Sequence, residues 1–251
     1  MSESPVSVER NGSVATLWLD RPERRNALDT ATLEALIQRV AELEHDFELK
    51  VLILAGRGKD FCSGADRTSP PGVSAGMEGR ERRFASQLGR RAARALEDLE
   101  VVTIARVHGH AIGGGCVLAL ACDFRIAEEG AVFSLPEVDL GLPLTWGALP
   151  RLAAEIGAAR AREMILMCEP VDAPLACQWG LVHRVVPESD LGTEVDRWAD
   201  RIASKPEMAV HMTKTQFRSL ARRSGLGDIT ESDGDLLTGA ARGDVARRSF
   251  S

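Results

Sequence analysis

The stretch VVTIARVHGHAIGGGC (residues 101–116) contains the features that decide the fold. Residues 101–107 are a short apolar run rich in β-branched side chains, which predicts a buried strand. A glycine-rich turn over residues 109–115 then leads into an apolar helix expected at 117–121. The first amides of such a helix lack partners within it, and with the positive end of the helix dipole they can bind an oxyanion. This feature alone leaves a second interpretation open, a tight turn that packs the helix on the strand.

A similar arrangement precedes this stretch in the chain. Residues 14–19 predict a strand, Asp29 or Thr30 can cap a helix, and residues 51–54 are a continuously apolar strand typical of a parallel sheet. Strand, crossover helix and second strand predict a βαβ unit. The segment FCSGAD (residues 61–66) follows closely. Its small residues expose backbone amides at the carboxyl edge of a parallel strand, where α/β proteins bind ligands.

The rest of the chain alternates and then becomes helical. Residues 67–79 hold prolines and glycines and predict a loop. Further elements are expected as a helix at 80–100, a strand at 123–127, helices at 158–168 and 172–179, a strand at 183–186, and one or two helices within 190–223. We therefore predict an α/β core over residues 1–190 and a helical C-terminal region over 191–251.

Composition restricts the function and the location. A formal net charge of −6 at pH 7 is not typical of nucleic-acid binders. The longest apolar stretch, residues 111–122, is too short to span a membrane, and no secretory signal is seen at the start, so a cytoplasmic protein is expected. The five cysteines show no CxxC pair, and His108 and His110 have no carboxylate or cysteine at ligand spacing. We expect reduced thiols and no metal site.

Four segments, taken in order, closely resemble the enoyl-CoA hydratase/isomerase (crotonase) superfamily. They are similar to its CoA-contacting segment, its two oxyanion loops and its catalytic segment, and they lie at residues 21–28, 61–66, 107–116 and 133–142. The resemblance runs from about residue 6 to the end of the chain. It implies a crotonase-type core of repeated ββα turns in a spiral, with a helical C-terminal trimerisation region. It also implies a homotrimer or a hexamer made of two trimers.

The resemblance further implies the ligand and the residues that bind it. The ligand is an acyl-CoA thioester, so coenzyme A is part of the substrate and no separate cofactor is expected. Its carbonyl oxygen would lie between the backbone amides of Ala65 and Gly114. The remaining residues expected near CoA and the acyl group are Arg25, Ala27, Ser63, Asp66, Arg67 and Gly113.

One catalytic position departs from the family pattern. The hydratases of the family use two glutamates; the second matches Glu137, but the first is replaced by Val117. A single base close to the enolate can still move a proton between two carbons, which predicts isomerase-like chemistry. A carboxylate in an apolar pocket should have a raised pKa. Asp139 is a candidate second carboxylate if its segment is extended, because side chains at i and i+2 share a face; the alternative is a helix cap or a salt-bridged loop residue.

Two other functions stay open. The first is different crotonase chemistry on a CoA thioester (hydrolysis, decarboxylation or dehalogenation), which Val117 and a pocket lined by His110, Asp139 and Thr145 would favour. The second is a non-catalytic protein that binds acyl-CoA or RNA, because the helix at 80–100 is rich in arginine. That helix also carries acidic residues, which favours a solvated face, so no nucleic acid is expected. The acyl group is not defined, and the loop at 67–79 with the helix after it is expected to form the pocket floor.

Overall fold

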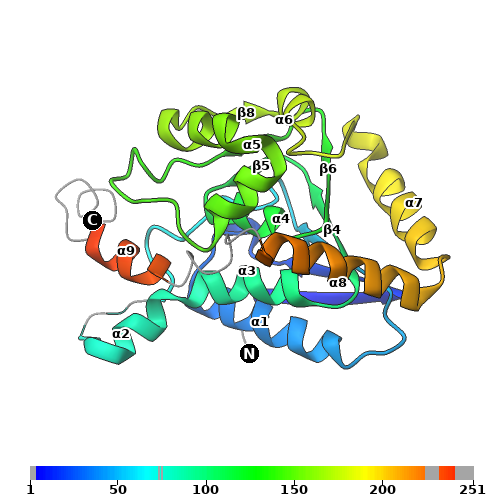
Figure 1. Cartoon of the computed structure of the whole chain (residues 1–251), viewed down its shortest axis with the longest axis horizontal. Coiled ribbons are helices and arrows are strands. Elements are labelled where there is room, and N and C mark those ends of the chain that lie inside the picture. Colours follow the sequence, from blue (N-terminus) through cyan, green and yellow to red (C-terminus); the bar gives the residue numbers. More distant parts are fainter. Residues whose placement is uncertain (1–3, 73, 75, 224–231, 241–251) are drawn as a thin grey trace.

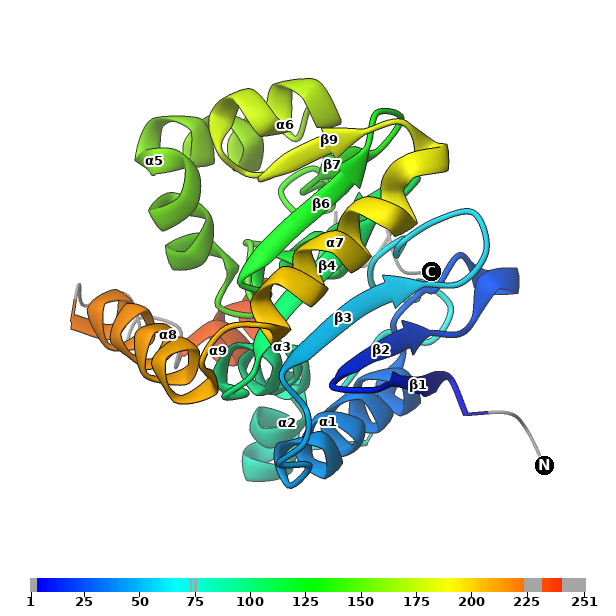
Figure 2. The same cartoon turned by 90° about the vertical axis from the view of Figure 1, so that its right-hand side faces the viewer.

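The computed structural model describes residues 4–72, 74, 76–223 and 232–240 of the chain. Its main sheet has the strand order β1-β2-β3-β4-β6-β9 (Figure 2). These strands are β1 (Val6–Asn11), β2 (Val14–Leu19), β3 (Val51–Gly56), β4 (Val102–Val107), β6 (Phe124–Glu128) and β9 (Arg184–Val186). Strand β1 pairs antiparallel with β2, and every other neighbouring pair is parallel. The predicted βαβ unit and the predicted strands of this sheet are confirmed.

A smaller sheet contains β5 (His110–Ile112), β7 (Val132–Ser134) and β8 (Val171–Asp172). Strand β5 lies inside the segment predicted as a glycine turn, and α4 (Gly114–Leu120) begins three residues before the predicted helix start. The turn prediction was therefore wrong over His110–Ile112. Glycine suggested irregular backbone there, but Ala111 is fully buried and β5 pairs with β7 in a parallel ladder.

Helices cover both faces of the main sheet (Figure 1; Figure 2). Helices α1 (Thr30–Glu44) and α3 (Leu88–Asp98) contribute to the larger apolar cluster on one face. Helix α7 (Leu191–Ala203) packs against β3, β4 and β6 in a second cluster on the other face. The predicted cap of α1 is confirmed, because the Asp29 carboxylate accepts a hydrogen bond from the Thr32 amide at 2.8 Å.

The remaining helices differ from the sequence prediction in two places. They are α2 (Gly79–Ser86), α5 (Ala148–Met167), α6 (Ala173–Trp179), α8 (Glu207–Arg223) and α9 (Asp233–Ala240), with short 3₁₀ turns at Pro22–Arg24 and Glu188–Asp190. The single helix predicted over 80–100 is two helices, α2 and α3, that meet at Gln87. Helix α5 begins ten residues before its predicted start at 158. Gly157, with φ of 75°, divides α5 into two halves. The sequence pattern was clear only in the second half.

The C-terminal helices pack on the core to different extents. Helix α7 belongs to the layer that covers the sheet, so the boundary expected at residue 190 precedes an element of the core. Helix α8 is attached by Lys214, whose ammonium group contacts the Asp123 carboxylate at 2.7 Å. Helix α9 lies beside α2 (Figure 1). The oligomerisation role of this region stays a prediction. In the part of the chain that the structure describes, no helix is long and apolar enough to cross a bilayer.

Candidate active site

A cavity of about 780 Å³ collects residues from all four of the segments recognised in the sequence. Its walls come from within residues 23–27, 63–71, 110–117 and 136–146, with Leu237 added by α9. The Val51–Gly56 and Val102–Val107 strands are parallel neighbours, so the loops that follow them leave the sheet at the same edge. The topology therefore brings the two glycine-containing loops together.

Ala65 and Gly114 line the cavity, and their backbone amides have no hydrogen-bond partner in the described part of the chain. The bridge between Leu28 and Ala65 uses the atoms on either side of Ala65: the Leu28 amide donates to the Gly64 carbonyl and the Asp66 amide donates to the Leu28 carbonyl, both at 2.8 Å. Gly114 is the first residue of α4, where an amide has no acceptor within the helix. Among the described residues, neither the Ala65 nor the Gly114 amide donates a hydrogen bond.

The glycine triplet at 113–115 is required by three different neighbours. A Cβ atom on the first glycine would lie 2.9 Å from a carboxylate oxygen of Glu137. On the second it would lie 2.4 Å from the Trp146 ring, and on the third 2.9 Å from the Cys62 sulfur. The triplet thus lets the Glu137 carboxylate, the Trp146 ring and Cys62 of the 61–66 segment approach the start of α4 closely.

Glu137 lies in an apolar environment beside Gly113. Its Oε2 atom is buried and has no hydrogen-bond partner in the described part of the chain. Burial disfavours the ionised form and raises the pKa of Glu137 to about 7, which its own backbone amide offsets only in part. The raised pKa expected from the sequence is confirmed. A carboxyl group that titrates near neutrality can both accept and return a proton.

The position of the first hydratase glutamate is occupied by Val117 on α4, which is 1% exposed and lines the cavity. Asp139 does not replace it, because it is exposed and outside the cavity lining. Its segment is a turn: the Leu142 amide donates to the Glu137 carbonyl at 2.9 Å. The segment is therefore not extended, and the condition for placing Asp139 beside Glu137 is not met. Glu137 is the one carboxylate of the segment that reaches the pocket.

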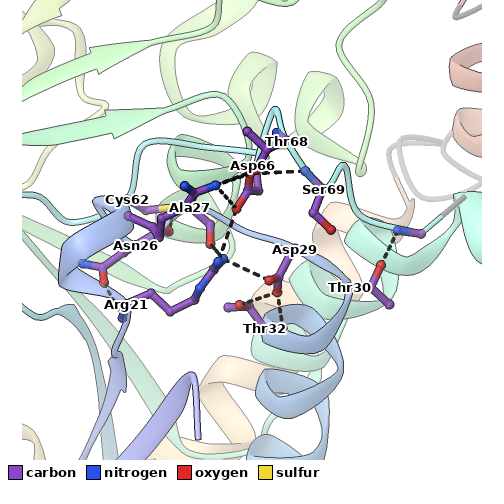
Figure 3. A network of polar contacts seen from close by, with 12 residues as sticks. Arg21, Asn26, Ala27, Asp29, Thr30, Thr32, Cys62, Asp66, Thr68 and Ser69 are labelled. Carbon is purple, nitrogen blue, oxygen red and sulfur yellow. Dashed lines mark hydrogen bonds and ion pairs between the residues drawn. The ribbon is translucent and has the colours of Figure 1, made fainter. Parts of the chain in front are cut away.

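Asp66, which also lines the cavity, is the centre of a polar network (Figure 3). Its carboxylate is contacted by Arg21 and Arg24, both at 3.3 Å, and accepts a hydrogen bond from the Thr68 amide at 2.9 Å. Burial alone would raise the pKa of Asp66, but hydrogen bonds from Thr68 and Ser69 and the charge of Arg24 outweigh it and lower the pKa to about 2. Asp66 therefore stays ionised and holds the loop after the first oxyanion segment.

A second carboxylate, Asp60, was missed by the sequence analysis. It accepts from Arg25 Nε and contacts His110 Nδ1, both at 2.6 Å. Burial alone would raise its pKa, but the hydrogen bonds from Arg25 and His110 lower it to about 2. Arg25 has a left-handed backbone with φ of 53°, and this contact fixes its side chain at the cavity rim. Only the fold reveals the contact, because the three residues come from distant segments.

The structure brings nearly all predicted ligand residues together. The lining includes Arg25, Ala27, Ser63, Ala65, Asp66, Arg67, Gly113, Gly114 and Glu137, together with His110 and Thr145, whereas Asp139 lies outside it. Sequence reasoning missed the apolar wall formed by Leu140, Leu142, Trp146 and Leu237. The cavity lining therefore combines arginines with a group of apolar side chains. The described residues contain no group of three or more His, Cys, Asp or Glu side chains arranged to hold a metal ion.

The fold and this cavity define a crotonase-type protein, and comparison with known proteins agrees. The chain belongs to the enoyl-CoA hydratase/isomerase family, whose model matches residues 9–244. It is 38% identical over 215 residues to the crotonyl-CoA hydratase of Syntrophomonas wolfei, covering 85% of this chain and 81% of that protein. Over 239 residues it is 36% identical to the peroxisomal Delta(3,5)-Delta(2,4)-dienoyl-CoA isomerase of Arabidopsis thaliana, covering 90% and 86%.

A solved structure supports the fold over the whole chain. The enoyl-CoA hydratase from Mycobacterium avium subsp. paratuberculosis K-10 superposes with a TM-score of 0.89 at 27% identity, covering 100% of this chain and 99% of that one. The relatives therefore include hydratases as well as an isomerase. Membership makes this chain an enzyme of the enoyl-CoA hydratase/isomerase type but does not select one of the two reactions.

Proposed function

We propose that the protein isomerises an enoyl-CoA thioester by moving one proton with Glu137. The single observation that carries the proposal is the buried Oε2 atom of Glu137, which has no hydrogen-bond partner among the described residues, with Val117 in the place of the other carboxylate. Hydration of a double bond needs a positioned water, which the two-glutamate members of the family hold with both side chains. A proton shift between two carbons needs a base and a stabilised enolate only.

The amides of Ala65 and Gly114 would stabilise that enolate. Removal of a proton next to a thioester carbonyl transfers negative charge to the carbonyl oxygen. Two donors that are already oriented pay no reorganisation cost in the transition state, and one such donor typically contributes about 3–4 kcal/mol. Glu137 lies beside Gly113, next to the second of these amides. It would take the proton from one carbon and return it to another.

The arginines of the cavity lining would hold coenzyme A. Those at positions 24, 25 and 67 match the phosphates of CoA in charge. Ala27 and Ser63 also line the cavity and would contact the pantetheine arm. CoA enters as part of the substrate. Assembly as a homotrimer or a hexamer belongs to the same proposal.

The test is to identify the product. We expect the purified protein to convert 3-enoyl-CoA to 2-enoyl-CoA faster than it hydrates 2-enoyl-CoA, with both products separated by chromatography. Glu137→Gln should abolish the conversion because an amide cannot accept the proton, whereas Glu129→Gln, an exposed carboxylate outside the cavity, should leave it intact. Full turnover by Glu137→Gln would remove the assigned base, and dominant hydration would assign the hydratase reaction.

A second candidate is other chemistry on a CoA thioester, which the apolar Val117 position also allows. A panel of acyl-CoA esters, followed by titration of free thiol, addresses the hydrolase version. Thiol release without double-bond migration would replace the isomerase assignment.

A further inference from the structure

Trp146, which lines the cavity, has an unusual backbone conformation. Its side chain lines the cavity and is 8% exposed, and its backbone has a left-handed φ of 59°, which a bulky residue rarely adopts. Gly147 follows with φ of 72°. A conformation of this kind persists only where its surroundings enforce it.

The surroundings of Trp146 do enforce it. The Trp146 carbonyl accepts a hydrogen bond from Arg151 at 3.0 Å, and Arg151 is itself fixed by Glu97 of α3 at 2.7 Å. The Gly147 amide donates to Asp233 of α9 at 2.6 Å. Three helices thus hold the turn that carries the indole.

Two glycines make room for the indole. A Cβ atom on Gly89 of α3 would lie 1.9 Å from Cε2 of Trp146, and one on Gly114 would lie 2.4 Å from Cζ3. The fused edge of the ring therefore lies over α3, while its benzo edge touches the first residue of α4. Any side chain at Gly89, the second residue of α3, would overlap the indole, so this position requires glycine.

We propose that Trp146 is the specificity-determining wall of the acyl pocket and restricts the enzyme to small acyl groups. The inference rests on the proposed function, because it places the thioester oxygen at the amides of Ala65 and Gly114. The benzo edge of Trp146 adjoins Gly114, so an acyl chain held at the Gly114 amide starts beside the indole. The expected pocket floor is thereby corrected in part: Pro70 and Pro71 of the 67–79 loop line the cavity, but α2 and α3 do not.

Binding measurements with the intact protein test the wall without requiring turnover. A series of saturated acyl-CoA thioesters of increasing length is titrated by calorimetry. With the wild type, affinity should stop rising at a short chain. Trp146→Ala should extend the rise to longer chains, with a gain of about tenfold for the first thioester that the wild type rejects. Trp179→Ala, a substitution of the same kind outside the cavity, should leave the profile unchanged.

Gly89→Ala tests the same wall from the α3 side of the indole. A methyl group at Gly89 pushes on the indole, so the limit should move to shorter chains, and Trp146→Leu in the same chain should relieve the effect. Circular dichroism checks that each variant is folded, and Trp146→Phe gives a milder variant if the alanine variant is not. Length profiles that are identical in wild type and folded Trp146 variants would overturn the inference. A profile that shifts while no enoyl-CoA is turned over would refute the proposed reaction but keep the wall.

Discussion

Asp66 and Glu137 are carboxylic acids that line the same cavity, but their surroundings shift their pKa values in opposite directions. Asp66 is surrounded by donors and arginines, and its pKa is lowered to about 2. Glu137 has an oxygen without a partner, and its pKa is raised to about 7. Burial raises the pKa of both groups, but at Asp66 the hydrogen bonds and the charge of Arg24 outweigh it, whereas at Glu137 only its own backbone amide opposes it. An acid with partners orders a loop, and an acid without them is available for proton transfer.

The largest expected effect concerns stability. Glu137 is neutral in the folded protein at a pH where an unfolded chain already ionises it. Its contribution to the free energy of unfolding is fully present below pH 4.5 and is lost as the pH rises to about 7. Over this pH range the free energy of unfolding of the wild type should fall by about 3 kcal/mol relative to that of Glu137→Gln. Urea unfolding of both proteins at a series of pH values measures the difference, and parallel curves would contradict a raised pKa.

The second effect concerns the rate. The base must be ionised to accept a proton, so kcat/KM should fall as the pH drops below about 7 and reach roughly one hundredth of its plateau at pH 5. Initial rates with 3-enoyl-CoA in a constant-ionic-strength buffer give the profile. A flat profile from pH 5 to 8 would show that Glu137 is not the titrating group.

A smaller effect is expected when Asp66 loses its charge. Asp66→Asn leaves Arg21 and Arg24 without their buried counter-charge and should lower the free energy of unfolding at pH 7 by about 2 kcal/mol. The matched control is Asp46→Asn, which removes an exposed ion pair with Arg10 and should cost less than about 1 kcal/mol. Equal losses in the two variants would mean that the network around Asp66 is no stronger than a surface pair.

The smallest effect is expected at Val117. Val117→Glu would add a second carboxyl group to the cavity, and the like charge should raise the midpoint of the pH–rate profile by about one pH unit. It should also increase hydration of 2-enoyl-CoA relative to isomerisation. Val117→Gln has the same shape without the charge and should leave the midpoint in place. An unchanged midpoint in both variants would show that the position does not couple to Glu137.

Much of the fold and the raised pKa of Glu137 were predictable from the sequence, and the reasons for the failures are physical. Strong local patterns gave the parallel strands, the Asp29 cap and the glycine loops, and Glu137 was expected in an apolar pocket. The short β5, β7 and β8 strands were missed because two or three residues carry too little periodicity and pair only with distant partners. The Arg25–Asp60–His110 contact and the Trp146 wall join remote segments, so no local pattern indicates them.

The glycine triplet at 113–115 has a consequence for how such a site can diversify. Each of its three positions faces a different functional part, so an added methyl group would disturb the base at the first, the acyl wall at the second, or the docking of the first loop at the third. New substrate preferences cannot arise there by small steps. Descendants of this chain would have to change the opposing side chains, Trp146 above all, while the start of α4 stays as it is.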